Sequence, residues 1–341
     1  MHRRRAKFAL QANISKMPRD DTEGNCAGIT RMKQRLAGLE TEGGRLKGLH
    51  MQTRPEDLFV VTTPKAGTTW TQQIVHQLRC LAANHKGAED FEEISCVVPF
   101  VEMAHDCGID LTQEQIASPR VFKTHFWYDH CPKGARYIWI IRDPLDVAVS
   151  FHRFFEGWFF EPGEVDLEEF MQQFILARGI PKNEMQNASY WDHLLSWWPH
   201  QQDENVLLVF FEDLKEDLKS SVQRIANFMG IDASNEALID EAVRRSSFHY
   251  MSARLTQFDE HILKEKRNPH CGLALDAGTH NPKVRAGTSG AGSQQIPRNI
   301  QTEMHQRWKQ VEEVTGFSTY ENMRLAVGLT ASLGGRDDKH D

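Results

Sequence analysis

The sequence predicts an α/β fold, a single domain in which helices flank a central, mostly parallel sheet. Stretches with helical spacing separate short, mainly apolar runs that suit buried strands, and these runs fall at residues 58–62, 121–124, 136–141 and 205–211. From Val206 to Phe211 the last run is continuously apolar, as expected of a strand that is buried on both faces. With 341 residues, 40% of them hydrophobic, the chain can form one full core.

Composition narrows the class of protein. The net charge of −7 argues against nucleic acid as a partner, because phosphate backbones require an excess of Lys and Arg. No run approaches 18 apolar residues, so we expect no membrane span. The six cysteines form no C-x-x-C pair and are expected to be reduced thiols: Cys26, Cys80, Cys96, Cys107, Cys131 and Cys271.

The two ends of the chain are expected to lie outside the domain. Residues 1–48 are polar and of low periodicity, and we predict a mobile leader with one short helix around 29–39. Its first 18 residues contain five basic side chains and no acid, which suits either a disordered basic tail or an organellar transit peptide. The domain is expected to span 49–325, and 326–341 to form a flexible tail.

A phosphate-binding loop follows the first strand. Residues 58–62 are followed by Thr63-Pro64-Lys65-Ala66-Gly67-Thr68-Thr69-Trp70, and a helix is expected from about 68 to 83. A strand, a tight loop and a helix start direct backbone N–H groups and the helix dipole at an anion. Lys65 precedes the only glycine of the loop, so this is not the nucleoside-triphosphatase motif, in which the lysine follows a glycine.

The order Pro-Lys-x-Gly-Thr-Thr-Trp closely resembles the 5′-phosphosulfate loop of the soluble, cytosolic-type sulfotransferases. The resemblance implies a P-loop-like fold, related to nucleotide kinases, and a donor, 3′-phosphoadenosine 5′-phosphosulfate (PAPS), that leaves as adenosine 3′,5′-bisphosphate (PAP). It also implies a cytoplasmic location and no metal. The implied donor contacts of this loop are Lys65, Ala66, Gly67, Thr68, Thr69 and Trp70.

The second strand leads to the expected catalytic segment. It places Lys123 and His125 at its carboxyl end, the edge at which open α/β sheets bind ligands. A lone histidine there is often only a core residue, but Lys-Thr-His resembles the catalytic segment of the family. The resemblance implies that His125 is the general base and that Lys123, with Lys65, stabilises the developing charge.

A second anion site follows the third strand. Arg142 ends that strand, Pro144 suits the first position of a helix, and Ser150 lies about two turns further along. In the family an Arg/Ser pair holds the 3′-phosphate of the donor, and we also count Ser150 among the catalytic residues. The alternative for Arg142 is a surface salt bridge with Asp143 or Asp146.

Further segments resemble the adenine and closing-loop segments of the family. The implied contacts are Phe211, where the family usually has Tyr, and Ser246, Phe248, Met251, Arg285, Ala286 and Gly287. Ala286 replaces a lysine and removes one phosphate contact. The family's usual dimer element is not found, so we expect a monomer or a non-standard dimer. Residues 253–283 show no periodicity and are predicted to form a mobile lid.

The acceptor is expected to be a small, partly apolar molecule with a hydroxyl or an amine. This expectation rests on four aromatic residues near the predicted catalytic segment: Phe100, Phe126, Trp127 and Trp158. Two other functions stay open. One is a P-loop kinase of small molecules or nucleotides, and the other is a protein that binds PAP without turnover.

Overall fold

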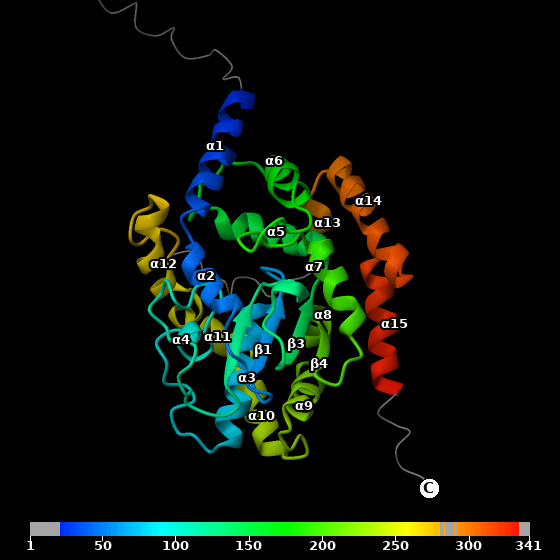
Figure 1. Ribbon diagram of the computed structural model, residues 1–341. Coiled ribbons are helices and arrows are strands. Elements are labelled where there is room, and N and C mark those ends of the chain that lie inside the picture. The colour runs from blue at the N-terminus through cyan, green and yellow to red at the C-terminus, as the bar shows by residue number, and fades with distance from the viewer. Residues whose placement is uncertain (1–20, 280–282, 284–289, 291, 334–341) are drawn as a thin grey trace, which may run out of the picture.

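The computed structural model describes residues 21–279, 283, 290 and 292–333 (Figure 1). Four parallel strands form its sheet in the order β2-β1-β3-β4. They are β1 (Leu58–Thr62), β2 (Val121–Thr124), β3 (Arg136–Ile141) and β4 (Val206–Phe210). The predicted α/β fold with a parallel sheet is therefore confirmed, and the first three strands have the predicted bounds.

Side chains of the strands alternate between two apolar layers. Val60 and Ile138 face one layer with α3 (Thr68–Ala82), α9 (Leu218–Met229) and α10 (Glu236–Arg245). Phe59 and Trp139 face the other layer, which includes α5 (Pro144–Phe155), α7 (Tyr190–Trp197) and α14 (Arg298–Thr315). Burial on both faces explains why these strands read as continuous apolar runs.

The remaining described elements cover the edges and ends of the sheet. The helices are α1 (Asp21–Leu36), α2 (Glu42–Leu49), α4 (Ile94–Val97), α6 (Leu167–Phe170), α8 (Phe211–Glu216), α11 (Phe248–Ser252), α12 (His261–Arg267), α13 (Gly292–Gln295) and α15 (Tyr320–Leu333). The shorter turns of helix are Tyr128–His130, Met171–Leu176, Trp198–His200, Leu255–Phe258 and Asn268–Cys271. Among the described residues, no helix is both long and apolar enough to cross a bilayer.

The strand order creates a binding position at one edge of the sheet. The chain passes from β1 to β2 on one side, and then crosses to β3 on the other side of β1. Val61 pairs with both Thr124 and Trp139, so the carboxyl ends of β1, β2 and β3 meet. Such a reversal leaves a crevice beyond the carboxyl ends of the strands, where ligands of open α/β sheets bind.

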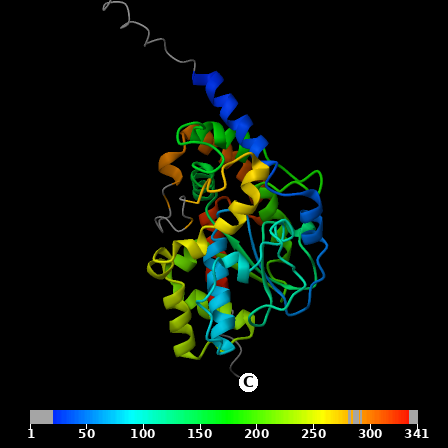
Figure 2. The same cartoon turned by 90° about the vertical axis from the view of Figure 1, so that its left-hand side faces the viewer.

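The folded body includes much of the predicted N-terminal leader. Ile29 and Met32 of α1 are fully buried in the main core, and Arg45 of α2 donates to Asn187 Oδ1 at 2.8 Å. The C-terminal part of α1 lies beside the segment around α12, although its first turns project beyond the body of the domain (Figures 1 and 2). Hydrophobic periodicity did not predict this packing, because part of it is made through glycines. At Gly44, for example, a Cβ would lie 2.5 Å from Asp106.

Two other boundaries also differ from the sequence-based expectation. The part of the predicted lid that is described, 253–279, contains α12 and a buried Asn268, which accepts a hydrogen bond from Trp158 Nε1 at 2.8 Å. Polar side chains hold this segment to the domain, so hydrophobic periodicity gave no signal of its structure. At the other end, α15 runs to residue 333, beyond the boundary expected at 325.

Candidate active site

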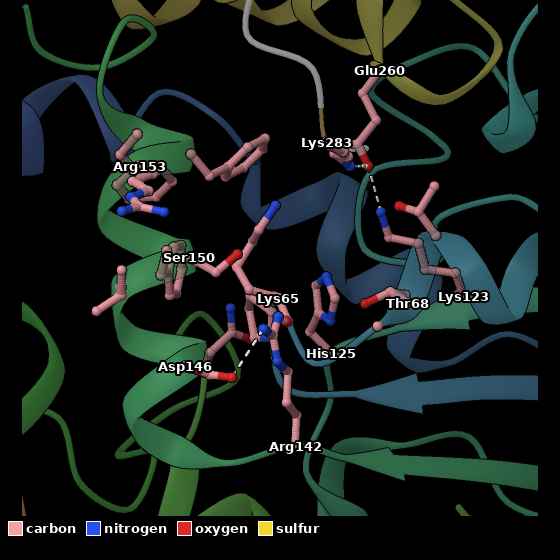
Figure 3. Close-up of a pocket in the computed structure, with 18 of the residues that line it drawn as sticks. Lys65, Thr68, Lys123, His125, Arg142, Asp146, Ser150, Arg153, Glu260 and Lys283 are labelled. Carbon is pink, nitrogen blue, oxygen red and sulfur yellow. Dashed lines mark hydrogen bonds and ion pairs between the residues drawn. The ribbon is translucent and has the colours of Figure 1, made fainter. Parts of the chain in front are cut away.

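A cavity of about 1820 Å³ lies beyond the carboxyl ends of the strands (Figure 3). It brings together fourteen of the residues predicted from the sequence. Those on its wall are Lys65, Gly67, Thr68, Thr69, Trp70, Phe100, Lys123, His125, Arg142, Ser150, Trp158, Phe211, Phe248 and Met251. Ala66, Ser246, Phe126 and Trp127 are described but do not line it, and Arg285, Ala286 and Gly287 lie outside the described residues.

The loop between β1 and α3 is shaped for an anion. Lys65 and Gly67 adopt left-handed backbone conformations, with φ of 74° and 109°. The Lys65 ammonium lies 4.0 Å from the centre of the Phe154 ring and has no hydrogen bond or ion pair within the described part of the chain. Burial, together with the positive charge of Lys283, holds the pKa of Lys65 well below its usual value. A cation in this position is stabilised by a negative ligand such as a phosphosulfate.

His125 is held as a neutral base. Its Nδ1 lies 2.8 Å from the carbonyl oxygen of Thr62, which can only accept, so Nδ1 carries the proton and Nε2 keeps its lone pair. Nε2 has no hydrogen-bond partner among the described residues. Burial, and next the charge of Lys123, hold the pKa of His125 well below its usual value. The imidazole is therefore unprotonated at neutral pH, as a general base must be.

Glu102 positions this catalytic segment from behind. One oxygen of its buried carboxyl accepts hydrogen bonds from the backbone N–H of His125 at 2.6 Å and from Thr124 Oγ1 at 3.0 Å. Burial raises the pKa of Glu102 to about 7. This role could not be predicted, because nothing near Glu102 in the chain distinguishes it from a surface acid.

A buried carboxylate joins two lysines at the cavity wall. Glu260 contacts Lys123 Nζ at 2.5 Å and also pairs with Lys283 (Figure 3). Glu260 is 5% exposed and has φ of 61°, an uncommon conformation for a residue with a Cβ. Burial and the two lysines act on it in opposite senses, and the lysines keep its pKa well below the usual value. Sequence reasoning missed both Glu260 and Lys283.

Arg142 and Ser150 face the cavity from β3 and α5, as predicted. The expected alternative partner of Arg142 is also present: Nη2 lies 3.3 Å from Asp146. Asp146 has other partners as well, since its two oxygens accept from the backbone N–H groups of Gly290 and Gly292 at 2.8 and 2.9 Å. Arg142 Nε has no partner in the described structure, which leaves it available to an anion such as a 3′-phosphate.

On the expected adenine side, Phe211, Phe248 and Met251 line the cavity. Ser246 contributes its backbone, because its carbonyl accepts from Trp70 Nε1 at 2.7 Å. Its hydroxyl is fully buried and has no hydrogen-bond partner among the described residues. The structure therefore places Ser246 against Trp70 and off the cavity wall, which differs from the predicted contact with the donor.

The structure brings two of the four predicted acceptor residues to the cavity wall. Phe100 and Trp158 line the cavity, but Phe126 is 1% exposed and packs beneath the Arg45 guanidinium. Trp127 packs edge-on against His130, outside the cavity. Side chains that follow a strand in sequence can point away from its ligand-binding edge, which is why proximity in the chain misplaced these two.

Comparisons with known protein sequences identify relatives of this chain. The sulfotransferase domain model matches residues 55–317. Sulfotransferase 1E1 of Cavia porcellus is 32% identical over 64% of this chain and 74% of its own length. The amine sulfotransferase of Oryctolagus cuniculus is 33% identical over 59% of this chain and 64% of its own length.

Solved structures show the same fold. Retinol dehydratase in complex with androsterone and the inactive cofactor PAP matches with a TM-score of 0.62 at 18% identity, over 81% of this chain and 87% of that one. Mouse sulfotransferase SULT7A1 complexed with PAP matches with a TM-score of 0.60 at 20% identity, over 85% of this chain and 95% of that one. The domain match covers most of the chain and sets aside the kinase alternative. The chain therefore belongs to the sulfotransferase family, enzymes that transfer a sulfuryl group from PAPS to small-molecule acceptors.

Proposed function

We propose that His125 is the general base of sulfuryl transfer to a small, partly apolar acceptor. The observation that carries this proposal is the hydrogen bond from His125 Nδ1 to the Thr62 carbonyl oxygen, which leaves Nε2 as the basic atom. In this role Nε2 takes the proton of an acceptor hydroxyl or amine as its O or N atom attacks sulfur. PAPS, when bound, supplies the activated sulfuryl group. A positioned base of this kind contributes about 10²–10⁴-fold to a rate.

The cations near His125 are assigned to the charge that develops during transfer. Lys65 and Lys123 would stabilise the sulfuryl oxygens and the bridging oxygen of the leaving phosphate. Lys283, which shares Glu260 with Lys123, adds a third ammonium to the same wall. Fixed cations in a cavity sheltered from water act strongly because they need no reorganisation during the reaction.

The donor is assigned to the loop 65–70 and to the cavity residues that follow β3 and β4 or lie in α5 and α11. Backbone N–H groups of the loop, with Thr68 and Thr69, would hold the 5′-phosphosulfate. Arg142 and Ser150 would hold the 3′-phosphate, and Phe211, Phe248 and Met251 would contact adenine. The unpartnered Lys65 ammonium and Arg142 Nε support this arrangement.

We also propose that the protein works in the cytoplasm. Five cysteines are free thiols, and all of them except Cys96 are buried: Cys80, Cys96, Cys107, Cys131 and Cys271. Reduced thiols suit that compartment.

The first test combines binding with turnover. Calorimetry should detect metal-independent binding of PAP that exceeds the binding of ATP, and an assay with PAPS and a panel of phenols should detect transfer. His125→Ala should lose about 10²–10⁴-fold in kcat and keep its PAP affinity.

The matched control is His85→Ala, at an exposed histidine outside the cavity. It should leave both PAP binding and turnover unchanged. Full turnover by His125→Ala would remove that residue from the mechanism. Binding of PAP without transfer to any acceptor would instead support the alternative of a binding protein.

A further inference from the structure

We propose that the acceptor carries an anionic group and that Arg178 binds it at the end of the cavity away from the donor. This inference rests on the proposed function, and it names the chemical class of the acceptor. The class is a hydroxyl compound with an apolar body and a carboxylate or a similar anion.

The cavity is larger than the assigned donor contacts require and has a second set of walls. These come from the end of α1 and the following turn, from the last turns of α5, and from residues 176–187. Lys65, Lys123 and His125 line the same cavity. None of the donor contacts assigned above comes from the end of α1 or from residues 176–187, so we assign these segments to the acceptor.

Arg178 stands out among the cations of this second region. Its guanidinium carbon lies 3.9 Å from the centre of the Phe174 ring and 5.7 Å from that of Phe151. Within the described ranges its side chain has no hydrogen bond or ion pair. The buried Arg120, in contrast, makes two hydrogen bonds to Asp57, at 2.6 and 2.9 Å.

The environment of Arg178 makes its positive charge more costly than it is in water, although the guanidinium stays charged at neutral pH. Desolvation lowers the pKa of Arg178 to about 10, even though Glu40 acts in the opposite direction. Glu40 is already committed, because it pairs with Arg45 at 2.7 Å. A partly buried charge is costly until a counter-charge reaches it, so an anionic ligand would gain affinity here.

The other charges on this side are positive, with the exception of Glu40. Lys33, Lys182 and Arg307 also line the cavity, and Glu40 is the one acid among the described residues of the second set of walls. This arrangement attracts anions and repels amines. The cavity wall also includes the aromatic side chains of Phe151, Phe154 and Trp158, which suit an apolar body.

The guanidinium further limits the class of anion. Its planar fork of N–H donors matches the two oxygens of a carboxylate, and stacking on Phe174 fixes its plane. The expected acceptor is thus an aryl or polycyclic hydroxy acid, and His125 would receive the hydroxyl proton. The acid would remain ionised throughout and take no part in the transfer.

The test compares acceptors that differ in one charge. We would measure kcat/KM with PAPS for 4-hydroxyphenyl-alkanoates of increasing chain length and for the amides and amines of the same lengths. At the best length the acid should exceed its amide by about 10- to 100-fold, because a charge-assisted hydrogen bond is stronger than a neutral one. The amine should be the poorest of the three.

Variants assign the preference to its residue. Arg178→Met should make acid and amide equal, mainly through the KM of the acid, and Arg178→Lys should restore part of the preference. PAP affinity should be unchanged, and kcat/KM should fall much more for the acid than for the amide. Lys309→Met, an exposed cation outside the cavity, is the control for general charge effects.

Three results would overturn the inference. The first is an equal kcat/KM for acids and amides at every chain length, and the second is an equal loss of kcat/KM for both in Arg178→Met. The third is a loss of PAP affinity in that variant, which would assign Arg178 to the donor. If the unaltered enzyme transfers to none of the compounds, the proposed function fails in this assay. Calorimetry of the acids with PAP-loaded protein, with and without Arg178→Met, then decides the inference separately.

Discussion

Glu260 influences the protonation of four charged or titratable side chains around it. Its negative charge raises the pKa values of Lys65, His125, Lys264 and Lys283, although burial lowers all four overall. The pKa of Lys283 settles at about 8. The left-handed backbone of Glu260 persists because two ion pairs hold the carboxylate in place, as is common for strained residues at functional sites.

Replacing that carboxylate should shift the pH dependence of the enzyme. In Glu260→Gln the pKa of Lys283 should fall below about 8, because desolvation then acts without compensation. The lysine would lose its proton at a lower pH, so the alkaline limb of the kcat/KM profile should move to lower pH. Glu260→Asp should move it less. An unchanged alkaline limb in Glu260→Gln would exclude Glu260 from control of the cavity lysines.

At the residue scale, the sequence predicts site residues that stand in local motifs, but it does not predict which residues distant in the chain will contact them. Lys65, Lys123 and His125 could be located because each stands at the carboxyl end of a strand or just beyond it. Lys123 and Glu260 are 137 positions apart, and no sequence pattern predicts that such a pair will meet. For the same reason the sequence misplaced Phe126, whose ring packs against Arg45 from a region expected to be mobile.

At the scale of elements, the turn from β1 into α3 depends on one glycine. Gly67 is the N-cap of α3, in a conformation that residues with a Cβ rarely adopt. A Cβ there would also lie 2.6 Å from the Phe211 ring, on the wall assigned to the donor. The element therefore requires glycine for two reasons, backbone conformation and space.

Gly67→Ala should damage both the fold and the donor site. We expect a loss of about 1–3 kcal/mol in the free energy of unfolding, from backbone strain and displacement of Phe211. PAP affinity should fall at least about tenfold, since the N–H groups of the loop are moved. Urea unfolding and calorimetry measure the two effects.

Gly43→Ala provides the comparison within the same chain. Gly43 lies in α2, and a Cβ there would meet nothing within 4 Å. This change should leave PAP binding intact and keep or slightly raise stability, as an alanine normally does in a helix. A Gly67→Ala protein that behaved like Gly43→Ala would show that the turn tolerates a side chain.

At the scale of the whole molecule, α1 and α2 complete the domain. The strands and α3 could be predicted because buried apolar runs and helical periodicity dominate there. The N-terminal helices could not, because they pack through glycines and polar contacts, such as the hydrogen bond from Thr41 Oγ1 to Asp106 at 2.6 Å. Their burial follows from the shape of the rest of the molecule.

Met32→Ala distinguishes a packed helix from a mobile leader. Met32 is 0% exposed in the main core, so its truncation should lower the free energy of unfolding by about 2–5 kcal/mol. Gln34→Ala, at an exposed position of the same helix, should change it by less than about 0.5 kcal/mol. Equal stability of the two variants would mean that α1 does not pack in solution.

The two sets of cavity walls differ in origin, and this has an evolutionary consequence. Of the residues assigned to the donor, those of the loop 65–70, Arg142 and Phe211 directly follow strands, where a change would disturb the sheet. The other set of walls includes the end of α1 and residues 176–187, which contribute no strand. Exchange of these two segments between homologues should therefore transplant substrate preference without rebuilding the catalytic apparatus. The same division allows natural homologues to keep the residues of the donor side while the residues of the other side change.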